Sequence, residues 1–173
     1  MRSFVFALLL PSLALVGTAS GQTLSGRRAP SFSLPDSNNV QHDILDYRGH
    51  WLVLTWIKTA GCTNCGPFVK ALEPLLKQVS ALNVMLPPET YVTGERFAKE
   101  NKITQPIVFD QSQVGIAYFK ATPANSRIDT PHAFIINPEG RIVDDWPDGR
   151  IGTILASKGG VAAALHALMT AKK

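Results

Sequence analysis

The amino-acid sequence predicts an α/β fold in which helices cover a central mixed sheet. Short apolar runs rich in β-forming residues alternate with segments that have the apolar spacing of amphipathic helices, and the chain closes with a predicted hairpin and one more helix. Strands that alternate with helices pair in parallel, whereas hairpin strands pair antiparallel, so we expect both kinds of pairing. The 173 residues suffice for one domain with its own core.

The composition excludes several other classes of protein. Gly (13 residues) and Pro (12 residues) occur at ordinary frequency, which argues against a collagen-like or largely disordered chain. The chain has 17 Lys and Arg and 13 Asp and Glu, which gives a net charge of +4. The basic residues form no stripe with interleaved aromatic residues. We therefore expect no nucleic-acid partner. Two cysteines are too few for a disulfide scaffold.

Residues 1–21 have the features of a signal peptide. A basic residue precedes the apolar stretch 4–16, and the small residues 17–19 follow it as a cleavage site. A proline interrupts the stretch, which is also shorter than the roughly 20 apolar residues that a membrane span needs. We expect cleavage, no stable membrane insertion afterwards, and an exported domain over 22–173 that is periplasmic or extracellular. An uncleaved signal anchor is the alternative.

The first half of this domain is predicted as a hairpin followed by a strand and a helix. Residues 29–34 alternate like an edge strand within a hairpin region over 24–49. The nearly continuous apolar run 51–57 is typical of a central strand covered on both faces. Apolar residues at helical spacing then predict a helix over 63–80, with a kink at Pro74 because proline lacks a backbone donor.

The second half continues the alternation of strands and helices. Turn-forming residues at 137–140 predict a hairpin, and a final helix carries one apolar face. The expected elements are strands at 83–86, 106–109, 132–136 and 141–143, helices at 94–101 and 111–120, and a last helix with Val161, Leu165, Leu168 and Met169 on its apolar face.

The two cysteines form a Cys-x-x-Cys motif between the apolar run and the predicted helix. Unpaired N–H groups and the positive dipole end of a helix favour a thiolate, so Cys62 is expected to have a pKa below the ordinary value of about 8.5 and to be the attacking nucleophile. Cys65, deeper in the first turn, is the expected resolving thiol. Just upstream, Lys58 could lower the pKa of Cys62 and Thr59 could hydrogen-bond its sulfur, or both could be the polar end of a strand.

The sequence resembles the thioredoxin superfamily over most of the mature chain. Cys62 and Cys65 match its redox motif, and Thr130-Pro131, two positions ahead of an apolar strand, match its threonine–cis-proline element. Three further segments are similar to the exported redoxin branch, which includes TlpA-like thiol–disulfide oxidoreductases and peroxiredoxins of the AhpC/TSA type; these segments are 29–34, 48–51 and 134–142.

The resemblance implies a thioredoxin-like three-layer α/β/α sandwich with a central mixed sheet, an N-terminal β-hairpin and an inserted α/β segment. It also implies that Thr130 and a cis Pro131 hold the backbone of a substrate against Cys62. The implied function is a thiol–disulfide oxidoreductase. Its partners would be protein thiol or disulfide substrates and an unidentified redox donor, and no cofactor is expected.

The chain departs from the family pattern at two places around the motif. Gly61 stands where an aromatic residue usually precedes the first cysteine. Trp56 stands where relatives tend to bury an acid for proton transfer, and Glu73 lies on the wrong stripe of the helix to point back at Cys65. The proton acceptor for Cys65 is therefore unassigned.

A thiol-dependent peroxidase that uses Cys62 is the main alternative. Thr59 and Cys62 have the spacing that such enzymes use to cradle peroxide. However, Thr55 stands where their pattern has a proline, and Pro131 stands where it has an arginine. Arg127 could replace that arginine only after a loop rearrangement.

The cysteine pair has two other interpretations. A redoxin-like chaperone could bind copper or zinc with two thiolates and a histidine, but the four histidines are scattered and only His132 is expected near the cysteines, so no metal site is predicted. A static disulfide across so short a loop would contribute little stability. The motif therefore favours redox exchange.

Overall fold

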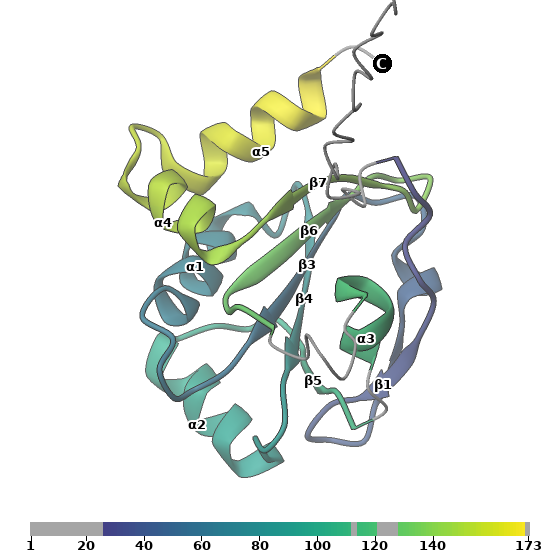
Figure 1. Cartoon of the computed structure of the whole chain (residues 1–173), viewed down its shortest axis with the longest axis vertical. Coiled ribbons are helices and arrows are strands. Elements are labelled where there is room, and N and C mark those ends of the chain that lie inside the picture. Colours follow the sequence, from purple (N-terminus) through teal and green to yellow (C-terminus); the bar gives the residue numbers. More distant parts are fainter. Residues whose placement is uncertain (1–25, 112–113, 121–127, 172–173) are drawn as a thin grey trace, which may run out of the picture.

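The computed structural model describes residues 26–111, 114–120 and 128–171, which form a five-stranded mixed sheet with helices on both faces (Figure 1). The strand order is β5-β4-β3-β6-β7; β3, β4 and β5 are parallel, and β6 is antiparallel to both β3 and β7. The strands are β3 (Leu52–Ile57), β4 (Ser80–Met85), β5 (Ile107–Phe109), β6 (His132–Ile136) and β7 (Ile142–Trp146). The predicted fold class is confirmed, and the predicted signal peptide over 1–21 lies outside the described residues.

Four helices cover one face of the sheet, and one helix and a hairpin cover the other (Figure 1). The first face carries α1 (Cys65–Leu72), α2 (Tyr91–Asn101), α4 (Asp148–Ala156) and α5 (Gly160–Thr170). The second face carries α3 (Val114–Phe119) and the antiparallel strands β1 (Ser33–Pro35) and β2 (Gln41–Asp43), with the 3-10 turn η1 (Ile44–Tyr47) after them. The predicted hairpin and inserted α/β segment are both present.

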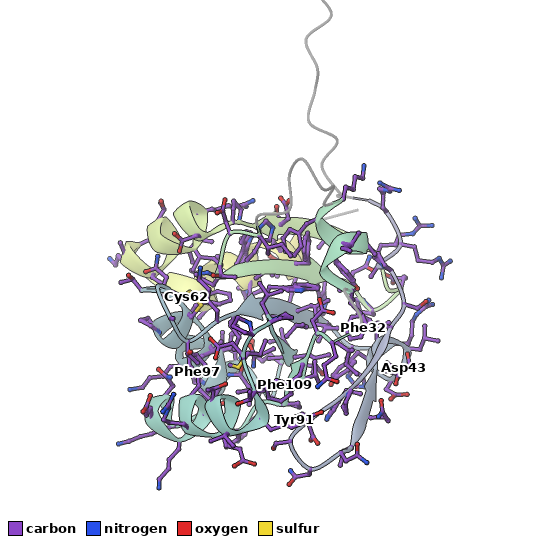
Figure 2. The ribbon with its side chains drawn as sticks, turned by 60° about the horizontal axis from the view of Figure 1, so that its bottom comes forward. Phe32, Asp43, Cys62, Tyr91, Phe97 and Phe109 are labelled. Carbon is purple, nitrogen blue, oxygen red and sulfur yellow. A yellow bond between two sulfur atoms is a disulfide. The ribbon has the colours of Figure 1, made fainter. Side chains whose placement is uncertain are left out.

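The central strand β3 is buried on both faces, as its apolar run predicts. Leu54 and Trp56 pack toward α3 and the hairpin, whereas Val53 and Ile57 pack toward α1 and its neighbours. On the α1 side, Phe97 of α2 packs with Phe109 at the end of β5, and the ring of Phe109 meets that of Tyr91 edge-on, with 4.5 Å between the ring centroids (these residues are labelled in Figure 2). Because β3 lies in the middle of the sheet, its carboxyl end is held rigidly from both sides.

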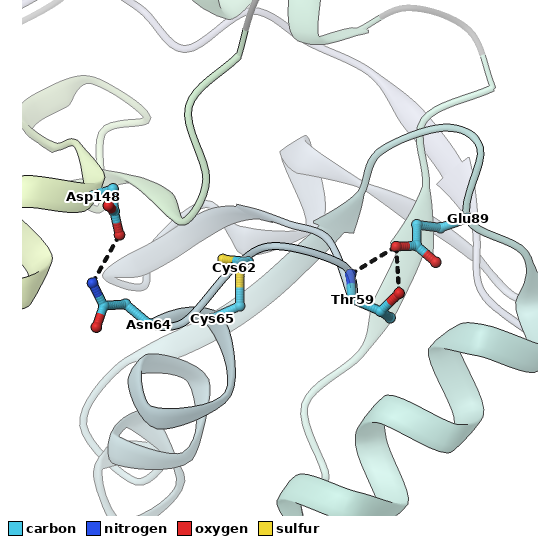
Figure 3. Close-up of a disulfide and its surroundings, with 6 residues drawn as sticks. All are labelled: Thr59, Cys62, Asn64, Cys65, Glu89 and Asp148. Atoms are coloured by element: carbon cyan, nitrogen blue, oxygen red, sulfur yellow. Dashed lines mark hydrogen bonds between the residues drawn. A yellow bond between two sulfur atoms is a disulfide. The ribbon is translucent and has the colours of Figure 1, made fainter.

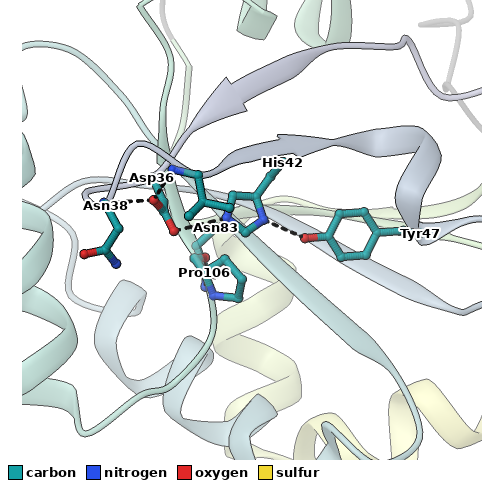
Figure 4. Close-up of polar contacts among 7 residues, drawn as sticks. Asp36, Asn38, His42, Tyr47, Asn83 and Pro106 are labelled. Atoms are coloured by element: carbon teal, nitrogen blue, oxygen red, sulfur yellow. Dashed lines mark hydrogen bonds and ion pairs between the residues drawn. The ribbon is translucent and has the colours of Figure 1, made fainter.

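A short chain of polar contacts fixes the hairpin (Figure 4). The carboxylate of Asp36 accepts hydrogen bonds from the backbone N–H groups of Asn38 (2.8 Å) and Val40 (2.9 Å). Its other oxygen lies 3.2 Å from the ring of His42, whose second nitrogen lies 3.4 Å from the hydroxyl of Tyr47. Burial, helped by the charge of Asp46, raises the pKa of Tyr47 to about 12, so this hydroxyl stays protonated at neutral pH.

The prediction of one helix over 63–80 is wrong for the second half of that range. The α-helix α1 ends at Leu72, a 3-10 turn (η2, Glu73–Leu75) follows, and the chain enters β4 at Ser80. Pro74 is the cause, because it lacks the N–H that would continue the helical hydrogen bonds. The later apolar residues, such as Val79, still pack into the core, so their helical spacing reflects burial rather than a continuous helix.

The elements after β6 are also longer than the sequence predicts. β7 extends to Trp146, three residues beyond the predicted end. The prediction stopped early because the two aspartates before Trp146 interrupt the apolar pattern. Helix α4 was not predicted at all. It contains two glycines, which are poor helix formers, and burial of Ile151 against the sheet offsets that cost.

Candidate active site

The two cysteines lie at the carboxyl end of β3, where the chain turns into α1 (Figure 3). They form a disulfide with a Cα–Cα distance of 5.5 Å. Gly61 precedes the first cysteine with φ +66°, a left-handed conformation that glycine adopts without strain. The glycine at the position where relatives carry an aromatic residue is therefore a requirement of this loop.

The two sulfurs have different surroundings. Cys62 is half-buried, whereas Cys65 is fully buried against Ile57 and Val69. The first hydrogen bond of α1 runs from the N–H of Phe68 to the carbonyl of Asn64 (2.9 Å), so the earlier N–H groups of the turn are not used within the helix. Such groups stabilise an anion at the helix start, which is where Cys62 lies.

Two carboxylates lie on either side of the disulfide loop (Figure 3). Before the loop, Oε1 of Glu89 accepts hydrogen bonds from the N–H (2.7 Å) and the hydroxyl (2.6 Å) of Thr59. Within the motif, the side-chain amide of Asn64 donates to Oδ1 of Asp148 (2.9 Å) at the start of α4. The residues on both sides of Cys62 are therefore tied to other elements of the fold.

Sequence reasoning missed both carboxylates. Asp148 belongs to the helix that was not predicted. Glu89 follows β4, the parallel neighbour of β3, so the topology itself was a signal, since the carboxyl ends of parallel strands meet at one edge of the sheet. Burial acts to raise the pKa of Glu89, but hydrogen bonds from Thr59, Thr93 and the backbone of Ala60 outweigh it and lower this pKa.

A polar cleft of about 330 Å³ opens beside the disulfide loop. Lys58 and Gly61 line it from the cysteine side, and Thr130 and Asp148 line it from the opposite side. The Thr130–Pro131 peptide bond is cis, which confirms that prediction. The hydroxyl of Thr130 is buried without a hydrogen-bond partner in the described part of the chain. The structure thus brings Lys58 and Thr130 to one cleft next to Cys62.

Thr59 and His132 are placed differently from what their modulating roles require. The hydroxyl of Thr59 donates to Glu89 and so directs its proton away from sulfur. The ring of His132 packs against Phe119 and Phe134, each at 4.8 Å between centroids, on the α3 face. Cys65 lies on the α1 face, so the sheet separates it from His132. Burial lowers the pKa of His132, against the opposing charges of two aspartates.

The end of β3 supplies no carboxylate beside Cys65, and Trp56 lies on the opposite face of the sheet. Its side chain points to the α3 face, and the residues of this strand end that face α1 are Thr55 and Ile57, neither of which carries a carboxylate. Glu73 instead accepts hydrogen bonds from Thr104, beyond the far end of α1. The prediction that Glu73 points away from Cys65 is confirmed.

Within residues 26–111, 114–120 and 128–171, no three His, Cys, Asp or Glu side chains gather as a metal site would require. Arg127, the substitute arginine of the peroxidase hypothesis, lies outside the described residues. In the same part of the chain no single helix is long and apolar enough to cross a membrane; α4 and α5 together pass on length and composition, but they are bent by 107° at their junction.

A Cys-x-x-Cys disulfide at the start of the helix after the central strand, across a cleft from the loop that carries the cis-proline, defines a thioredoxin-like thiol–disulfide oxidoreductase. The chain belongs to the AhpC/TSA family, whose model matches residues 25–144. The predicted family and the predicted oxidoreductase activity are thereby confirmed.

Individual relatives agree with this class. The chain is 29% identical over 152 residues to the thiol-disulfide oxidoreductase ResA of Geobacillus kaustophilus, covering 79% of this chain and 81% of the relative. It is 28% identical over 155 residues to ResA of Geobacillus thermodenitrificans, covering 82% of this chain and 83% of the relative.

Solved structures show the same fold. The thioredoxin domain of a thiol-disulfide oxidoreductase from Bacteroides vulgatus superposes with a TM-score of 0.64 at 15% identity, over 85% of this chain and 99% of that one. A putative thiol:disulfide interchange protein DsbE from Chlorobium tepidum superposes with a TM-score of 0.58 at 20% identity, over 70% of this chain and 83% of that one.

Proposed function

We propose that Cys62 is the attacking thiol and Cys65 the resolving thiol in disulfide exchange with protein substrates. The observation that carries the assignment is the difference in exposure between the two cysteines: Cys65 is 0% exposed, whereas Cys62 is half-buried and follows Gly61, which lines the cleft. A bulky protein disulfide can reach only an accessible sulfur, and attack needs the thiolate that the helix start favours.

The exchange balances over two thiolate attacks. The Cys62 thiolate attacks one sulfur of a substrate disulfide, forms a mixed disulfide and displaces the second substrate sulfur as a thiolate. The Cys65 thiolate then attacks the Cys62 sulfur, forms the Cys62–Cys65 disulfide and releases the first substrate sulfur. The substrate gains two electrons, and a dithiol donor restores the reduced pair by the reverse sequence.

The cis-proline loop supports a role in substrate binding. Thr130 lines the same cleft as the loop that carries Cys62, and its hydroxyl has a hydrogen-bonding capacity that the described residues leave unused. A substrate backbone laid along Thr130 and Pro131 would be held against the disulfide loop. Lys58, in the same cleft, would add positive charge near the attacking sulfur.

We also propose that the protein acts outside the cytoplasm, after removal of residues 1–21. The composition of that leader supports export, and an oxidising compartment is where a dithiol protein meets disulfide-bonded substrates. The periplasm and the cell exterior both fit, and the redox donor would be a dithiol protein of the same compartment.

Alkylation of the reduced protein tests the assignment of the two thiols. Iodoacetamide should modify Cys62 first, with a rate that rises through a pKa below the ordinary value of about 8.5, while Cys65 reacts slowly because it is buried. Mass spectrometry of peptides after timed quenching gives both rates, and the urea-unfolded protein is the control. Equal rates at the two cysteines, or faster modification of Cys65, would contradict the assignment.

A further inference from the structure

Glu89 is distant in sequence from the loop that leads to Cys62, but its carboxylate is hydrogen-bonded to that loop. It lies between the end of β4 and Thr90, the residue that caps α2. The Oε1 atom of Glu89 accepts hydrogen bonds from both the N–H (2.7 Å) and the hydroxyl (2.6 Å) of Thr59. Figure 3 shows Glu89 on the side of Thr59 away from the disulfide.

The loop that Glu89 contacts has little else to hold it in place. Ala60 and Gly61 are exposed, and Gly61 has a left-handed backbone conformation, so apolar burial does not fix their positions. Hydrogen bonds to an ionised acceptor are shorter and about twice as strong as neutral ones. The two bonds from Thr59 to Glu89 therefore fix the position at which the chain leaves β3 and enters the loop that carries Cys62.

We propose that Glu89 is a positioning residue of the redox centre, acting on Cys62 through Thr59. It holds the loop so that the Cys62 sulfur meets both the N–H groups at the start of α1 and an incoming disulfide in one geometry. The carboxylate itself touches no substrate. This inference rests on the proposed role of Cys62 as the attacking thiol.

The test is the rate at which reduced variants attack a small aromatic disulfide, measured at pH values where Cys62 is fully ionised, so that every variant has the same fraction of thiolate. Glu89→Ala removes the contacts, and a displaced nucleophile should react about tenfold to a hundredfold more slowly. Glu89→Gln retains an oxygen acceptor for Thr59 and should stay within about threefold of the wild-type rate. Thr59→Val removes one bond only and should lose about threefold to tenfold.

The chain offers a matched control in Glu73. Its carboxylate also accepts a threonine N–H (2.6 Å) and the hydroxyl of the same residue (3.0 Å), here from Thr104. It lies beyond the other end of α1, about 12 Å along the helix axis from the cysteines. Glu73→Ala should lower the urea midpoint in the same way as Glu89→Ala but leave the rate of attack within about twofold of wild type.

Two results would overturn the inference: a wild-type rate in both Glu89→Ala and Thr59→Val, or a rate in Glu89→Gln as low as in Glu89→Ala, which would assign the effect to charge. Failure of the underlying assignment has a different signature. If Cys62 is not the attacking thiol, Cys62→Ser itself retains the attack on the aromatic disulfide, whatever residue stands at position 89.

Discussion

Replacing Cys65 with serine is expected to leave Cys62 joined to its protein substrates as persistent mixed disulfides. The first attack needs only the half-buried Cys62, whereas release needs the buried Cys65, which in the native protein forms the disulfide with Cys62. Turnover should fall to background, because each protein molecule stops after the first step. Non-reducing electrophoresis of the purified variant after mixing with an oxidised protein substrate measures the adduct.

Matched variants keep this result specific. Cys62→Ser should trap nothing, because the remaining Cys65 thiol is fully buried. Thr63→Ser, a change at an exposed position between the two cysteines, should turn over normally and leave no adduct. Adducts through Cys65 in the Cys62→Ser variant, or none in Cys65→Ser, would refute the order of attack.

Trp56→Ala is expected to cause the largest loss of stability, about 3–5 kcal/mol of the free energy of unfolding. The indole of Trp56 is fully buried and packs against three aromatic rings. The distances between ring centroids are 4.7 Å to Tyr118, 5.2 Å to Phe119 and 5.6 Å to Phe134. Removing it would leave a large void between β3 and α3, and the three rings would lose a common partner.

Urea unfolding of the oxidised protein, with the disulfide intact in both variants, measures this loss. Val92→Ala, on the exposed side of α2 with 72% of the residue accessible, serves as the control and should change the free energy by no more than about 0.5 kcal/mol. A loss below about 1 kcal/mol for Trp56→Ala would mean that the aromatic cluster on the α3 face is not a rigid part of the core.

Local patterns in the sequence predicted the parts of the fold that depend on local chemistry. The apolar run of β3, the Cys-x-x-Cys motif and the hairpin turn between β6 and β7 all lie where they were expected. The end of α1 was misplaced because apolar spacing continues past Pro74, although the backbone cannot. Helix α4 was missed because its stability comes from packing on the sheet rather than from its own residues.

The neighbours of the redox pair were harder to predict than the pair itself. A strand buried on both faces has no polar alternation, so nothing in the run 51–57 says on which face Trp56 lies. The contact between Thr59 and Glu89 joins positions 30 residues apart. It exists only because β3 and β4 are adjacent parallel strands, and the link from Asn64 to Asp148 spans 84 residues and depends on α4.

The central claim, that the Cys62–Cys65 pair exchanges disulfides with proteins, is tested most directly by mixing the reduced wild-type protein with a disulfide-bonded protein substrate. Acid quenching and mass spectrometry then count both disulfides. We predict one new Cys62–Cys65 disulfide for each substrate disulfide lost, and slower oxidation of the pair by hydrogen peroxide at the same concentration. Rapid consumption of peroxide, with the substrate disulfide unchanged, would contradict the claim and identify a peroxidase.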